Sequence, residues 1–268
     1  MPGPGHGRDR TRNEARGEDR IVRRGVRAPG GAPRRAAGDV GAAPADEHAD
    51  PRCLGPGEGA ALLADARWRR AVVLGDSSVD SAGMTVVPGW ARAPWTDRVI
   101  AALREAHPRF ACLHPRGRRE LPLSHVRSTQ LGDALDFNGD LALLACGGPE
   151  LRARSFDPDA MEFELSRILA ALRGATCQVV LVVSPFDLTQ AGEVPADQVA
   201  GLRARQRLLS ERIEAVVLRH GCVHVDLAAH EGPSPGDLWG ARPGRLSSRG
   251  HAVAAAAVVR TLGRLLAT

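Results

Sequence analysis

The sequence contains no tyrosine and no lysine, and only 3% of its 268 residues are aromatic. Proteins that bind nucleic acids stack aromatic rings on the bases and gather basic residues along the phosphates. All 36 basic residues here are arginines. This one-sided usage indicates coding bias, so the isoelectric point near 9.5 is weak support for a nucleic-acid partner. We therefore predict that the protein does not bind nucleic acid.

Long hydrophobic runs are also absent. The longest apolar stretches, at 179–183 and 252–259, are far shorter than the roughly 20 residues that cross a membrane. The first 20 residues have no apolar core of the kind found in secretory signals. The sequence thus predicts a cytoplasmic protein that makes no contact with membranes.

Motifs for metals and cofactors are missing as well. The cysteines are scattered singly with no CxxC pair, which predicts reduced thiols rather than disulfides or a zinc site; they are Cys53, Cys112, Cys146, Cys177 and Cys222. No GxGxxG motif follows the first apolar run, no GK[ST] occurs, and no His, Asp and Glu residues have metal-ligand spacing. We predict that the protein needs no cofactor and no metal.

The residues that are present suffice for a hydrophobic core, since 43% are hydrophobic and 25% are charged. Residues 1–60 differ from the rest because they are rich in Arg, Gly, Pro and Ala and show no helical or strand period. Such a segment cannot bury enough apolar surface to offset its ordering entropy. The sequence predicts a disordered extension over residues 1–60 and one folded domain over residues 61–268.

Within that domain, short apolar runs alternate with amphipathic stretches. The runs predict five strands, at 71–74, 110–113, 141–146, 177–183 and 222–225. The amphipathic stretches predict helices from 95 to near 108 and over 126–135, 158–172, 199–217 and 252–266. The alternation predicts an α/β fold with a parallel sheet covered on both faces. Functional residues are expected in the loops after the strands' carboxyl ends.

Four sequence blocks follow these strands in order: VVLGDSSVDSAGM, ACLHPRGRR, LALLACGGPELR and WGARPGRLSSRGH. Together they resemble the signature blocks of the SGNH (GDSL-type) hydrolases, a family of serine esterases, lipases and acyltransferases. The resemblance covers roughly residues 68–266. It implies a flavodoxin-like three-layer α/β/α sandwich built on a parallel five-stranded sheet.

The resemblance also implies roles for particular positions. It places the nucleophile on Ser77 and an oxyanion-binding N–H on Gly117, whereas Pro149, Arg242 and Arg245 occupy the positions of the family's Asn, Asp and His. Proline has no N–H to donate, and a guanidinium has no lone pair that could accept the serine proton. We therefore expect the usual triad hydrolysis to be lost.

Two functions stay open on this sequence. In the first, the protein is a catalytically degenerate binding module for a small acyl ester or an anionic ligand. Arg242 and Arg245 would then converge with Ser77 and the Gly117 N–H on a carboxylate, phosphate or sulfate.

In the second, the protein is a divergent ester hydrolase or acyltransferase in which Ser77 works with a non-standard base. Two loop histidines, His114 and His230, are candidates for that base. His251 matches the family's Gly-His pair at the start of the last helix, where a capping or packing role is expected.

Overall fold

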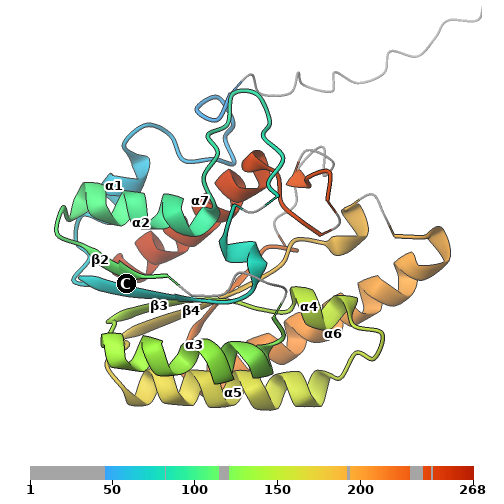
Figure 1. Cartoon of the computed structure of the whole chain (residues 1–268). Helices are drawn as coiled ribbons and strands as arrows, with labels where there is room; N and C mark the ends of the chain where they lie inside the picture. The colour runs from blue at the N-terminus through green and yellow to red at the C-terminus, as the bar shows by residue number, and fades with distance from the viewer. Residues whose placement is uncertain (1–45, 82, 115–120, 192–193, 230–237, 243) are drawn as a thin grey trace, which may run out of the picture. The chain divides into compact units, whose positions relative to one another are not determined.

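The computed structural model describes residues 46–81, 83–114, 121–191, 194–229, 238–242 and 244–268, with the backbone alone at Ser77. Five parallel strands form one sheet in the order β2-β1-β3-β4-β5 (Figure 1). The strands are β1 (Arg70–Leu74), β2 (Ala111–Leu113), β3 (Leu141–Ala145), β4 (Val179–Ser184) and β5 (Val223–Asp226). The predicted parallel five-stranded sheet is confirmed.

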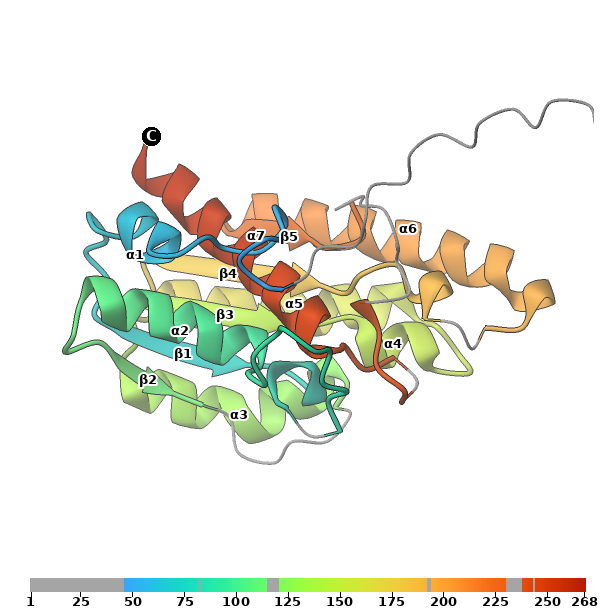
Figure 2. The same cartoon turned by 90° about the horizontal axis from the view of Figure 1, so that it is seen from above.

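Helices cover both faces of this sheet. One layer holds α1 (Glu58–Leu62), α2 (Trp95–Ala106) and α7 (Ser248–Leu266), which lie together over the sheet when it is seen from above (Figure 2). The opposite layer holds α3 (Leu123–Phe137), α4 (Gly148–Arg152), α5 (Pro158–Gly174) and α6 (Ala196–Arg219). Two short 3₁₀ helices, η1 (Ser77–Val79) and η2 (Leu188–Gln190), follow β1 and β4. The expected three-layer sandwich is therefore confirmed.

The central strands are apolar because both of their faces are covered. All five residues of β3 are buried, and so are five of the six in β4. The register pairs Val72 with Ala142 between β1 and β3. The hydrophobic core thus runs through the middle of the sheet and fixes where the ends of these strands lie.

Side-chain caps set two of the helix starts. Asp157 accepts a hydrogen bond from the Ala160 N–H at 2.9 Å at the start of α5, as its Asp-Pro sequence suggests. Ser247 caps α7 through the Gly250 N–H at 3.1 Å. Because of this cap, α7 begins at Ser248, four residues before the start predicted from its apolar run.

The predicted boundary at residue 60 differs from the structure. Residues 46–60 belong to the compact unit that spans Ala43–Thr268, and α1 begins at Glu58. Cys53 is buried in the core, and the buried Asp50 accepts a hydrogen bond from Arg249 Nε at 2.9 Å. Composition failed here because a few contacts with the distant helix α7 fix this segment. Residues 1–45 lie outside the described part of the chain.

No helix in the described part of the chain is long and apolar enough to cross a membrane.

Gly250 allows α7 to pack closely on the loop before it. A Cβ atom at this position would lie 2.2 Å from the Leu238 carbonyl oxygen. Since that neighbour is backbone and cannot move aside, we expect Gly250→Ala to lower the free energy of unfolding by about 1–3 kcal/mol or more. The matched control is Gly201→Ala on the exposed side of α6, where no atom lies within 4 Å. It should gain about 0.5–1 kcal/mol. Denaturant unfolding of both variants tests this, and equal stabilities would contradict it.

Candidate active site

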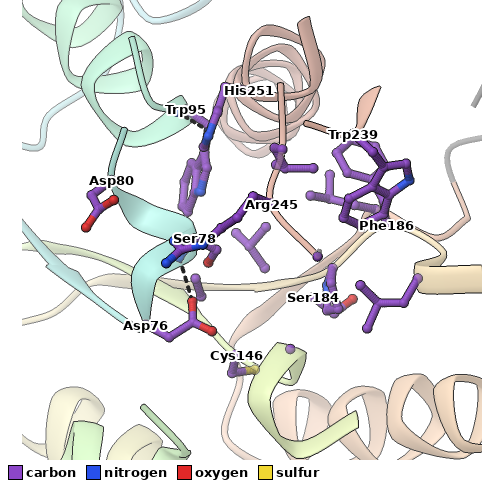
Figure 3. Close-up of a pocket in the computed structure, with 18 of the residues that line it drawn as sticks. Asp76, Ser78, Asp80, Trp95, Cys146, Ser184, Phe186, Trp239, Arg245 and His251 are labelled. Carbon is purple, nitrogen blue, oxygen red and sulfur yellow. Dashed lines mark hydrogen bonds between the residues drawn. The ribbon is translucent and has the colours of Figure 1, made fainter. Parts of the chain in front are cut away.

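A pocket that is partly open to solvent lies at the carboxyl ends of β1, β3 and β4. The chain leaves β1 toward β2 on one side and later returns to β3 on the other, which creates a crevice at this edge of the sheet. One part of the lining is apolar and includes Met84, Trp95, Phe186, Leu188, Leu227 and Trp239. The polar part includes Asp76, Ser78, Arg152, Ser184, Arg245 and His251 (Figure 3).

The turn after β1 is held in place by the neighbouring elements. Gly75 has a φ of +144°, and a Cβ there would lie 2.9 Å from the Ala145 carbonyl oxygen, so this approach of β1 to β3 requires glycine. The buried side-chain amide of Gln130 accepts from the Gly75 N–H at 2.9 Å and donates to its carbonyl at 2.8 Å. These contacts fix the backbone that leads into η1, whose first residue is Ser77.

Asp76 is one of two buried acids among the described residues that line the pocket, and Asp80 is the other. The Oδ1 atom of Asp76 accepts a hydrogen bond from the Ser78 N–H at 2.8 Å. Burial raises the pKa of Asp76 above its ordinary value of 3.8, while the Ser78 hydrogen bonds and the charges of Arg152 and Arg245 act in the opposite direction. A Cβ at Gly148 would lie 3.4 Å from Asp76 Oδ2 and 3.5 Å from Arg152 Nη1. The carboxylate and this guanidinium therefore both lie close to Gly148.

Arg245 comes from the loop before α7 and reaches across the pocket toward Ser78 (Figure 3). The Arg245 carbonyl accepts the Gly240 N–H at 2.7 Å, which closes the loop. Gly244 has a φ of +61°, and a Cβ there would lie only 2.7 Å from Arg152 Nη1. The loop thus passes directly over Arg152. Arg245 from this loop and Arg152 from α4 therefore place two guanidiniums on the side of the pocket that holds Asp76.

Comparison with known families agrees with this geometry. The model of the GDSL-like lipase/acylhydrolase family matches residues 73–253. The chain belongs to this family.

Solved structures share the fold. The α/β hydrolase LAE5 from the metagenome of Lake Arreo, Spain, aligns at 19% identity and a TM-score of 0.56, over 74% of this chain and 96% of its own. The acetylxylan esterase Axe2 from Geobacillus stearothermophilus aligns at 14% identity and a TM-score of 0.54, over 73% and 94%. At these identities the likeness shows the fold alone. A comparison with curated protein sequences found no significant match.

The two arginines that the sequence resemblance aligns with the family's acid and base differ in where their side chains lie in this GDSL-like protein. Arg245 lines the pocket, whereas Arg242 is exposed, and its side chain lies over Gly83 with Cδ 3.0 Å from where a Cβ would be. Instead of Arg242, Arg152 shares the pocket with Arg245. The predicted convergence of Arg242 and Arg245 is therefore replaced by a pair that consists of Arg245, from the loop before α7, and Arg152, from the end of α4.

In the block after β3, the sequence resemblance aligns Pro149 with the family's Asn. Pro149 is the second residue of α4. The buried side chain of the next residue, Glu150, accepts the Leu123 N–H at 2.7 Å and so caps α3. Burial raises the pKa of Glu150, and the nearby charge of Asp76 raises it further. In this protein the block fixes α3 through Glu150, and the side-chain donor that it presents to the pocket is the guanidinium of Arg152.

His251 lines the pocket, but its hydrogen bonding and its low pKa prevent it from acting as a base there. Its Nδ1 accepts the Trp95 N–H at 3.2 Å, which assigns the ring proton of the neutral imidazole to Nε2. Burial lowers the pKa of His251 to about 3, and the charges of Arg98 and Arg245 act in the same direction. These contacts fit the packing role that was expected for His251 at the start of α7.

Of the other residues predicted for the site, the structure describes the side chain of His114 only. His114 has Nδ1 3.8 Å from Asp97 Oδ1 at the start of α2, and it is not among the residues that line the pocket. Gly117 and His230 lie outside the described residues, as does the side chain of Ser77. The suggested roles of these three residues stay predictions.

Sequence reasoning missed three pocket residues. Arg152 ends the short helix α4, and Cys146 and Ser184 stand at the ends of β3 and β4. Their place after apolar runs was the signal that could have found Cys146 and Ser184. Burial raises the pKa of the Cys146 thiol well above 9.0, with the charges of Glu150 and Asp76 adding to it, so this sulfur stays protonated.

Proposed function

We propose that this family member binds a small acyl compound in the pocket and does not hydrolyse it through Ser77. The observation that supports this most is the guanidinium of Arg245 in the pocket, at the position where the family resemblance expects the base. A guanidinium cannot accept the serine proton. His251, the histidine among the described lining residues, has its Nδ1 lone pair engaged by the Trp95 N–H.

The lining favours a ligand with an apolar body and a carbonyl or carboxylate head. Phe186 and Trp239 meet edge to face, with ring centroids 6.4 Å apart, and form an apolar wall that suits an acyl chain. Arg245 and Arg152 supply N–H groups that match two oxygens at once. An acyl chain would therefore lie against the aromatic wall with its oxygens toward the guanidiniums.

Carboxylate binding in this pocket should be coupled to protonation of Asp76. Burial already raises the pKa of Asp76, and a bound carboxylate would raise it further by repulsion between like charges. Carboxylate binding should therefore draw a proton to Asp76. As a result, the affinity should increase as the pH falls, until the ligand itself becomes protonated.

Titration calorimetry with hexanoate tests the binding part of the proposal. We expect Arg245→Gln to weaken hexanoate binding about 10- to 100-fold, because a hydrogen bond to a charged group contributes about 1.5–3 kcal/mol. The matched control is Arg242→Gln, since Arg242 is exposed and outside the pocket lining. It should bind hexanoate within about twofold of the wild type. Equal losses in both variants, or a wild-type Kd weaker than about 1 mM, would contradict the proposal.

Ester turnover tests the second part. Wild type and Ser77→Ala should release 4-nitrophenol from short-chain esters at the same steady-state rate. A Ser77-dependent turnover above about 1 s⁻¹, the low end for ordinary enzymes, would favour the divergent hydrolase instead. One observation favours that second candidate: His114 Nδ1 lies 3.8 Å from the Asp97 carboxylate, an acid that could orient the ring. Loss of such turnover in His114→Gln would identify the base.

A further inference from the structure

A chain of hydrogen bonds runs from the pocket to the surface of α6 through residues that the family resemblance does not use. Ser184, at the end of β4, lines the pocket on the Cys146 and Phe186 side (Figure 3). Its Oγ lies 3.0 Å from Nε2 of His224, and His224 Nδ1 lies 3.0 Å from Oε2 of Glu214. A serine, a histidine and an acid are thus linked in the order that activates a serine nucleophile.

The strand register explains why these residues meet. Ser184 pairs with Asp226 and Val182 with His224 across β4 and β5. Since side chains alternate between the faces of a strand, Ser184 and His224 are diagonal neighbours on one face. Glu214 comes from α6, which packs on β5. The arrangement follows from the regular sheet and helix and needs no loop to hold it.

The environment of the two side chains suits proton transfer. Ser184 is 1% exposed, and the side chain of His224 is 5% exposed, so water is largely excluded from the bond between them. When Glu214 accepts the Nδ1 proton, the lone pair of a neutral His224 faces Ser184 Oγ at Nε2. The Ser184 hydroxyl donates a hydrogen bond to Asp226 Oδ1 at 3.1 Å, so in the resting protein this carboxylate competes with His224 Nε2 for the serine proton.

We propose that Ser184 is a second nucleophile of this pocket, with His224 as its base and Glu214 as the positioning residue. The serine oxygen attacks the carbonyl carbon of an activated acyl ester, and its proton moves to His224 Nε2. The bond between that carbon and the leaving oxygen then breaks, and the leaving group takes the proton from His224. The products are an O-acyl serine and the free alcohol or phenol.

The backbone after Ser184 limits the rate of this acylation. Serine hydrolases use backbone N–H groups, often including one next to the nucleophile, to stabilise the oxyanion. The next residue is Pro185, which has no N–H. The loss of one such donor costs about 10²–10³ in rate. The acyl group on Ser184 should therefore form slowly from activated esters and persist, giving one acylation per chain rather than turnover.

Reaction of the full chain with 4-nitrophenyl hexanoate tests the inference. We expect a burst of one 4-nitrophenol per chain, an intact mass raised by one hexanoyl group, and a peptide map that places this group on Ser184. Ser184→Ala should lose the adduct, and His224→Gln should form it at least about 100-fold more slowly. An adduct on Ser77 or on a surface residue, or no adduct, would overturn the inference.

The positioning role of Glu214 is tested with a rate measurement that a purely structural role would leave unchanged. Glu214→Gln should lower the maximal acylation rate about tenfold or more without changing the ester concentration that gives half of that rate. Glu211 supplies the matched control, because it is another exposed acid on α6 that pairs with Arg207 and not with a histidine. Glu211→Gln should acylate like the wild type, and equal rates for Glu214→Gln and Glu211→Gln would remove Glu214 from the inference.

The inference rests on the proposed function in one respect, because the acyl compound must enter the same pocket. Calorimetry with hexanoate, which contains no ester to react, separates the two. Hexanoate binding without an adduct on Ser184 would overturn only the nucleophile. A Ser184 adduct without hexanoate binding would support the nucleophile and contradict the proposed carboxylate site.

Discussion

Replacement of Asp50 by alanine should lower the free energy of unfolding by about 3–5 kcal/mol. The side chains of Asp50 and Arg249 are 1% and 4% exposed, with Oδ2 and Nε 2.9 Å apart. The Arg249 guanidinium also lies over the Trp90 ring, 5.2 Å from its centroid. Removal of the acid leaves the guanidinium buried without its main counter-charge, and breaking a buried pair costs far more than the pair contributes. Denaturant unfolding of the two proteins measures the loss.

Two further variants separate this cost from the loss of an ordinary ion pair. Glu211→Ala breaks the exposed pair with Arg207, whose side chains are 64% and 78% exposed, and should cost less than about 1 kcal/mol. The double variant Asp50→Leu/Arg249→Met removes both members of this buried pair and should be more stable than Asp50→Ala. A loss in Asp50→Ala no larger than that in Glu211→Ala would show that residues 46–60 do not contribute to the fold.

The pH dependence of this contribution follows from the pKa of Asp50. Burial alone raises that pKa, but the Arg52 N–H and the hydrogen bond and charge of Arg249 outweigh it and hold it below 3.8. A carboxyl group with a lower pKa in the folded state stabilises the fold above its unfolded pKa and stops doing so as the pH falls through the folded value. The stability difference between wild type and Asp50→Ala should be constant near neutral pH and shrink below about pH 4.

The sheet could be predicted because its information is local. Strand β3 is a run of apolar residues that are all buried, and the turn glycine Gly75 directly follows β1. The segment 46–60 could not be predicted in this way. Its stability depends on pairs such as Asp50 with Arg249, which lie 199 positions apart in the sequence. Composition reports how much apolar surface a segment carries, but it does not report such partners.

The site could be predicted only in part, for a related reason. Block matching located Arg245 in the pocket region, but spacing alone does not say that Arg242, three residues earlier, lies outside it. Arg152 and Asp76 both lie close to Gly148 because the end of α4 and the turn after β1 come together there. Ser184 and His224 meet because two strands pair in a particular register. Contacts across the sheet and between loops carry much of this site, and a single sequence does not contain them explicitly.

The triple change Pro149→Asn, Arg242→Asp and Arg245→His should create ester hydrolysis that depends on Ser77. It places an amide donor on α4, a base at a position that lines the pocket, and an acid three residues before that base. The Arg245 N–H donates to the Arg242 carbonyl at 3.1 Å, so the two positions belong to one tight turn. We expect steady-state turnover at least about 10³-fold above that of wild type, because the loss of a triad member costs up to roughly 10⁴–10⁶ in kcat.

The single variants decide whether the gain is due to a triad. Members of a triad act as a unit, so each change made alone should raise turnover less than about tenfold. The control is the triple variant with Ser77→Ala added, which should return to the wild-type rate. Thermal melts establish that each variant folds, and the exposed position of Arg242 makes its replacement mild. A folded triple variant without Ser77-dependent turnover would show that a histidine at 245 and an aspartate at 242 do not act as base and acid for Ser77, and it would contradict the assignment of Arg245 to the base position.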